Sequence, residues 1–132
     1  MDDLGEAAAV MALFDHFSHG IATGHGADVA ATLHLDAQLD IVTSESTILR
    51  GTGEVRAFLD RYASIATRYV WRWDRREVRV RGDVAWLVAV GEERTVTGDG
   101  EVKRAYRMTV VATREEGRWG LTQIHGSSPV EG

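Results

Sequence analysis

Hydrophobic residues in the first half of the chain recur at the three-to-four spacing of helices that bury one side. Residues 3–19 carry such a stripe, which includes Phe14 and predicts a long helix that faces a core. Gly20, Gly24 and Gly26 are expected to break this helix after residue 19. Residues 27–33 fit a short second helix, and residues 54–66 fit a third.

The rest of the chain alternates between hydrophobic and polar residues, as half-buried strands do. Residues 37–42 and 46–50 predict two short strands before the third helix. Turn-forming segments then divide the second half into four long strands, which three hairpin connections make antiparallel. These strands are expected at residues 69–80, 84–97, 102–114 and 118–129.

The first long strand changes phase in its middle. Tyr69, Trp71 and Trp73 share one face, whereas Val78 and Val80 have the opposite parity. One extra residue in a strand produces such a change, so we expect a β-bulge at residues 74–76 that bends the sheet.

The last strand carries an apolar-to-polar gradient. At period two, one face holds Trp119, Leu121, Gln123, His125 and Ser127. A strand that enters a core at one end and lines a pocket at the other needs this arrangement. We therefore expect the polar end to face a ligand.

Composition narrows the function classes. The 132 residues fit one domain spanning 1–132, with a net charge of -5 that argues against nucleic-acid binding. The acidic N-terminus and the absence of an 18-residue apolar stretch favour a cytoplasmic protein without membrane segments.

No phosphate loop, dinucleotide fingerprint or cysteine is present, so no cofactor is expected. His16 and His19 have helical metal-ligand spacing but no visible third ligand, so no metal is predicted either.

The order of elements and the tail resemble the NTF2-like superfamily, in its SnoaL-like branch. The tail resemblance is carried by residues 107–111, by Gly117-Arg118-Trp119, and by the closing Gln123-x-His125-x-Ser127-x-Pro129. The resemblance implies an α+β fold: a cone-shaped barrel with a strongly bent antiparallel sheet packed on N-terminal helices. It also implies a homodimer through the outer face of the sheet.

Ketosteroid isomerase is the best-known enzyme on this fold, and it uses a carboxylate base and a tyrosine donor. In a gapless alignment its tyrosine position falls on Phe17 and its base position on Ile41. Neither side chain can do that chemistry. Asp40 is adjacent, but a one-residue slip turns a side chain to the other face. Steroid isomerisation is therefore not expected.

A small-molecule pocket remains the main hypothesis, with cofactor-independent isomerisation, cyclisation or dehydration as its chemistry. The predicted catalytic residues are His125 and Asp40. The predicted ligand-binding residues are Phe14, Phe17, Phe58, Trp71, Trp86, Arg107, Gln123 and Ser127. Structural or interface roles for these side chains remain open.

Two further interpretations concern surfaces. Arg72, Arg75, Arg76, Arg79 and Arg81 make the first long strand basic, and we interpret this as a solvated face balanced by acids that include Glu77, Asp83, Glu92 and Glu93. The alternative to a pocket protein is a non-catalytic association or ligand-sensing domain. Such a domain would make its contacts through the exposed face of the sheet.

Overall fold

Three helices and six strands make up the chain in the computed structural model, which describes residues 3–36, 38–45 and 47–129. Their order confirms the predicted succession of two helices, two short strands, a third helix and four long strands. The elements are α1 (Asp3–Thr23), α2 (Gly26–Ala31), β1 (Asp40–Val42), β2 (Ile48–Arg50), α3 (Gly51–Ser64), β3 (Arg68–Arg81), β4 (Val84–Thr97), β5 (Gly100–Glu115) and β6 (Arg118–Ser127). The predicted starts of the two short strands, Ala37 and Ser46, lie outside the described residues.

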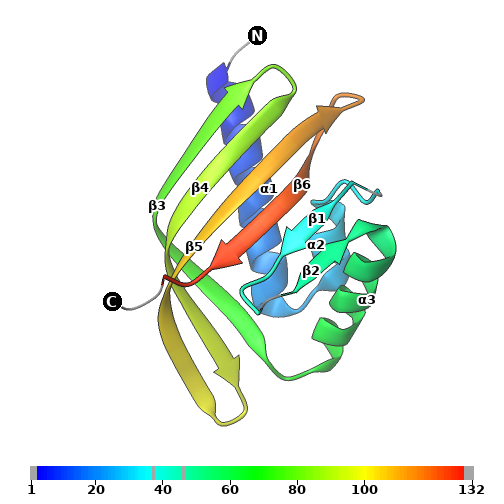
Figure 1. The fold of residues 1–132 in the computed structure, drawn as a ribbon. Helices are drawn as coiled ribbons and strands as arrows, with labels where there is room; N and C mark the ends of the chain where they lie inside the picture. Colours follow the sequence, from blue (N-terminus) through cyan, green and yellow to red (C-terminus); the bar gives the residue numbers. More distant parts are fainter. Residues whose placement is uncertain (1–2, 37, 46, 130–132) are drawn as a thin grey trace.

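The strands form one bent sheet in the order β2-β1-β6-β5-β4-β3. The four long strands pair antiparallel, as predicted, whereas β1 pairs parallel with β6 and makes the sheet mixed. Figure 1 shows α1 running along one side of the long strands, with α2 and α3 beside the short ones. This is the expected α+β arrangement, with a strongly bent sheet packed on N-terminal helices.

Helix α1 is longer than predicted because Gly20 does not end it. A Cβ on Gly20 would lie 2.7 Å from Cγ2 of Val29, so the glycine lets α2 approach α1 closely. The helix instead ends before Gly24, whose φ is +72°. In the described part of the chain, no helix combines the length and the apolar character that crossing a membrane requires.

The predicted bulge in the first long strand is confirmed. The β3–β4 register shifts between Trp73 and Arg75, and Gly91 lies across from this point. A Cβ on Gly91 would lie 2.0 Å from the carbonyl oxygen of Arg72, so only glycine fits there. The extra residue at this point bends the two paired strands.

A second irregularity, which the sequence did not predict, lies between β5 and β6. Val111 pairs with Gln123 but Ala112 pairs with Leu121, so Thr122 is an extra residue. Leu121 and Ile124 are both buried, although they have opposite parity in the sequence. The inward face of β6 is therefore different from the one predicted.

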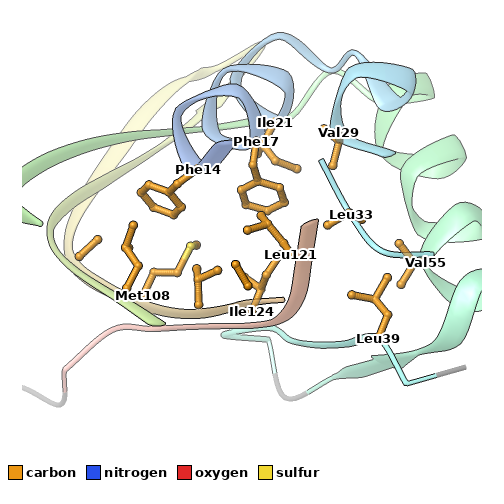
Figure 2. Packing of buried hydrophobic residues seen from close by; sticks show 14 of the residues in the cluster. Phe14, Phe17, Ile21, Val29, Leu33, Leu39, Val55, Met108, Leu121 and Ile124 are labelled. Carbon is orange, nitrogen blue, oxygen red and sulfur yellow. The ribbon is translucent and has the colours of Figure 1, made fainter. Parts of the chain in front are cut away.

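The core lies between α1 and the concave side of the sheet. Phe14, Phe17 and Ile21 of α1 are buried, and Figure 2 shows them facing Leu121 and Ile124 of β6. Each large apolar side chain buried here contributes about 1.5–3 kcal/mol relative to an exposed position. This packing fixes one wall of the cavity described next.

Candidate functional site

A cavity of about 240 Å³ lies between the helices and the bent part of the sheet. Its apolar wall combines residues from α1, α3, β3 and β1. The rings of Phe17, Phe58, Tyr62 and Trp71 line it, together with Ile41. An enclosure of this kind, largely apolar with a few convergent polar groups, is typical of small-molecule sites.

Stacked aromatic rings make the wall rigid. Trp71 stacks on Phe17 at 5.9 Å between ring centroids and on Tyr106 at 6.1 Å. On the other side, Tyr62 stacks on Tyr69 at 5.8 Å. The Tyr62 hydroxyl donates to the carbonyl of Ile21 and accepts from the amide of Tyr69. These contacts hold flat surfaces toward the cavity, which suits a planar ligand.

Glu93 is the centre of a polar corner of the cavity. This side chain is 2% exposed, yet it carries a carboxyl group. Its Oε2 accepts a hydrogen bond from the indole Nε1 of Trp71 at 2.8 Å. Its Oε1 accepts from Nε and Nη2 of Arg104 at 3.0 and 2.7 Å. The strand register explains why these three side chains meet, because Glu93 on β4 pairs with Trp71 on β3 and with Arg104 on β5.

Arg104 links this carboxylate to the turn between β1 and β2. Its Nη2 also donates to Oγ of Ser44 at 3.1 Å and lies 3.7 Å from Oε1 of Glu45. Burial opposes the charge of Arg104, but the Glu93 hydrogen bonds outweigh it and raise the pKa of the guanidinium. A second, more open hollow of about 390 Å³ is lined by Arg104 and shares Glu45 and Tyr69 with the cavity.

Tyr106 completes the polar corner from β5. Its side chain lines the cavity and is 5% exposed, and burial raises the pKa of Tyr106 to about 12. A Cβ on Gly126 would lie 2.1 Å from the hydroxyl oxygen of Tyr106, so a glycine at that position of β6 makes room for it. At neutral pH, Tyr106 is therefore a hydrogen-bond donor and not a base.

The buried Tyr106 predicts a loss of stability in alkali. The pKa is near 10 in the unfolded chain and about 12 in the folded protein, so the unfolded state loses its proton first. Between these values the free energy of unfolding falls with pH, by about 2–3 kcal/mol in total. Urea unfolding at about pH 9 and about pH 12 measures this loss. Tyr106→Phe is expected to show a smaller loss, and an identical loss in both proteins would contradict the assignment.

Three of the predicted ligand-binding residues line the cavity: Phe17, Phe58 and Trp71. Phe14 is fully buried behind them, where it packs against Trp73 at 5.6 Å between ring centroids. Trp86 points the other way, because its exposed position alternates with the buried Ala85 and Leu87 on β4.

The polar tail does not line the cavity. His125, Gln123 and Arg107 are exposed on the outer face of the sheet, and Ser127 accepts a hydrogen bond from Nε of Arg107 there. The prediction that the polar tail faces a ligand is wrong because the bulge at Thr122 reverses the parity of the strand. Ile124 and Gly126 face inward instead and line the cavity.

Asp40 also lies outside the cavity lining. Its carboxylate is 3.4 Å from Nε of Arg50 on the neighbouring strand. Ile41, the next residue, lines the cavity, which confirms that the two side chains lie on opposite faces. Neither predicted catalytic residue is thus brought to the polar corner.

The sequence interpretation missed Glu93, Arg104 and Tyr106. Glu93 was grouped with the solvated acids, and the structure corrects this because its side chain is buried. A signal was present: Glu93 has the same parity as the buried Ala85, Leu87 and Ala89 of its strand. A charged residue in phase with a buried face requires a partner there, and Arg104 supplies it.

Comparisons with known proteins agree with the fold. The profile of the family described as SnoaL-like domain matches residues 10–131. No curated protein sequence matches the chain. Among solved structures, a proposed dehydratase of the NTF2-like family from Streptomyces avermitilis is 18% identical, with a TM-score of 0.86 over 96% of this chain and 98% of its own.

Two structures from Novosphingobium aromaticivorans are also similar. A proposed aromatic ring hydroxylase is 18% identical, with a TM-score of 0.83 over 99% of this chain and 94% of its own. A proposed scytalone dehydratase is 11% identical, with a TM-score of 0.81 over 96% of this chain and 86% of its own. At such identities the likeness concerns the fold alone.

Proposed function

We propose that this chain, which belongs to the SnoaL-like domain family, binds a hydrophobic aromatic small molecule in its cavity and transforms it by acid–base chemistry. One observation carries the proposal: an aromatic-lined cavity of about 240 Å³ contains the buried carboxylate of Glu93 in its lining. That volume favours a ligand of about one or two rings. The ligand would be oriented by its polar atoms.

Glu93 is the proposed proton acceptor. A carboxylate offers about four acceptor sites, and Trp71 and Arg104 occupy three of them. The remaining site is on Oε2, and Glu93 lines the cavity. When a ligand C–H bond beside a carbonyl breaks, its proton would pass to Oε2 and its electron pair would move toward the carbonyl oxygen. Isomerisation, cyclisation and dehydration can each begin with this step.

Similar structures support this class of chemistry without defining the reaction. Two of the three described above are proposed dehydratases, and the third is a proposed aromatic ring hydroxylase. The aromatic wall and the buried carboxylate of the present chain fit a dehydration or isomerisation of an aromatic compound. Ketosteroid isomerase chemistry has no support at Phe17 or Ile41, since neither carries a polar group.

Binding is tested by calorimetric titration with 1-naphthol and 1-tetralone as probes. Ile41→Trp would fill the cavity from a half-buried position and is expected to lower the affinity at least about tenfold. Ile48→Trp is the matched control, because Ile48 is 47% exposed on β2 and does not line the cavity. The proposal fails if wild type binds neither probe, or if both variants bind them as wild type does.

Acid–base activity is tested by hydrogen–deuterium exchange at the carbon beside the carbonyl of 1-tetralone in D₂O. The wild-type protein is expected to accelerate exchange, and Glu93→Gln to reduce the acceleration about 100-fold or more. Glutamine keeps the shape of the side chain but is not a base. Exchange that is unchanged in this variant would remove Glu93 from the proposed role.

We also propose that the outer sheet face pairs two copies of the chain. Val84, Trp86, Val88 and Val90 form a row on β4 whose members are 36–43% exposed. Such a row is apolar surface that self-association would cover. In sedimentation, Trp86→Glu is expected to yield monomers, whereas Val102→Glu at the hairpin would not. A monomeric wild-type protein would contradict this proposal.

A further inference from the structure

The charged side chains in the cavity lining are unequally partnered. Among the described residues these are Glu45, Arg61 and Glu93. The two carboxylates share one guanidinium, since Nη2 of Arg104 lies 2.7 Å from Oε1 of Glu93 and 3.7 Å from Oε1 of Glu45. The guanidinium of Arg61 has neither an ion pair nor a hydrogen bond within the part of the chain that the structure describes. It is therefore available to a ligand.

Arg61 lies at the rim of the cavity. Helix α3 presents Phe58, Arg61 and Tyr62 on the same side, because residues three and four apart in a helix are neighbours, and all three line the cavity. Tyr62 is buried and Phe58 is half-buried, whereas Arg61 is exposed. The guanidinium thus stands where the apolar lining meets the solvent.

The opposite charge lies at a different depth. Glu93 is 2% exposed, and both Nε and Nη2 of Arg104 already donate to it. A ligand carboxylate beside Glu93 would bring two like charges together away from water, which is costly. A carboxylate at the rim would meet Arg61 and stay partly hydrated. The charges therefore orient an anionic ligand with its rings inward and its acid group outward.

The chemistry of the rim favours a carboxylate over an amine. A guanidinium is a planar fork of N–H donors, which matches the two oxygens of a carboxylate. The carboxyl group available to an amine at the rim is that of Glu45, and it already lies beside Arg104. Between Arg61 and Glu93 the lining is formed by Phe17, Phe58 and other apolar side chains, which suits the rings of the same ligand.

We infer that Arg61 determines the specificity of the cavity, and that the ligand is an aromatic carboxylic acid whose carboxylate pairs with Arg61 at the rim. This inference rests on the proposed function, because it assumes that the cavity binds an aromatic small molecule. It adds the charge of the ligand and its orientation. The carbon on which Glu93 acts then belongs to the inner end of the ligand, away from the carboxylate.

The test compares two probes of nearly equal shape: 1-naphthylacetate, which is an anion, and 1-naphthylacetamide, which is neutral. In calorimetric titration, wild type is expected to bind the acetate at least about fivefold more tightly than the amide. Arg61→Gln is expected to weaken acetate binding about five- to tenfold and to leave amide binding unchanged. Arg61→Lys, which keeps the charge but not the fork, is expected to lie between the two.

Arg56→Gln is the matched control. Arg56 is exposed on the same helix but does not line the cavity, so this variant loses the same net charge at a different place. Raising the NaCl concentration from about 20 mM to about 500 mM is expected to weaken acetate binding to wild type and to Arg56→Gln, because ions screen an exposed pair. Acetate binding to Arg61→Gln is expected to depend much less on salt.

The possible failures are distinguishable. The inference is overturned if wild type does not prefer the acetate, or if Arg56→Gln weakens acetate binding as much as Arg61→Gln does. In either case the proposed function stands as long as 1-naphthol, 1-tetralone or the amide binds to wild type and Ile41→Trp weakens that binding. If wild type binds none of the four probes, the inference and the proposed function are both overturned.

Discussion

Replacing Gly126 by alanine is expected to weaken 1-tetralone binding at least about tenfold while the protein remains folded. The new Cβ would lie 2.1 Å from the Tyr106 hydroxyl oxygen and 2.8 Å from its ring carbon, so the ring has to move. That ring is stacked on Trp71 and lines the cavity, so its displacement changes the shape of the binding site. Overpacking of this size costs about 1–3 kcal/mol of stability.

Calorimetric titration of the variant measures the affinity, and thermal unfolding confirms that it folds. Gly98→Ala is the control, since nothing lies within 4 Å of a Cβ at that position. Unaltered 1-tetralone affinity in Gly126→Ala would show that the ligand does not reach Tyr106.

The largest stability effect is expected from Gly91→Ala. A Cβ at this position would lie 2.0 Å from the carbonyl oxygen of Arg72, which is backbone and cannot turn aside. The clash falls at the bulge that bends β3 and β4, so the two strands have to separate or lose their bend. We expect a loss of about 3 kcal/mol in the free energy of unfolding.

Gly53→Ala is the matched control for Gly91→Ala, with an effect of opposite sign. Gly53 lies in α3 with open space around it, so alanine is expected to stabilise the helix by up to about 1 kcal/mol. Urea unfolding of both variants gives the comparison. A Gly91→Ala protein as stable as wild type would mean that the bend does not depend on this close approach.

The sequence predicted the fold well because its main signals are periodic. The bulge in β3 was visible in the sequence, since apolar residues on both sides of it, Trp73 and Val78, differ in parity. The bulge in β6 was not visible. Gln123 and His125 continue the parity of Leu121, and the inward Gly126 has no side chain to reveal the change. Polar residues in phase with a core were therefore interpreted as pocket residues.

The same reasoning explains the other errors. A glycine in a helical pattern signals an end from sequence alone, but at Gly20 it signals contact with Val29, which only the tertiary structure reveals. Glu93 was predicted to be solvated because acids usually are. Its burial depends on Trp71 and Arg104, which lie 22 and 11 residues away and meet it only through strand register.

The central claim is that the cavity between α1, α3 and the bent sheet is a binding site with Tyr106 and Glu93 at its polar corner. A crystal structure of the wild-type protein soaked with 1-tetralone tests it most directly. We expect the rings between Phe17 and Phe58, with the carbon beside the carbonyl facing Oε2 of Glu93. Ligand found only on the outer face beside His125 and Arg107, with the cavity empty, would contradict it.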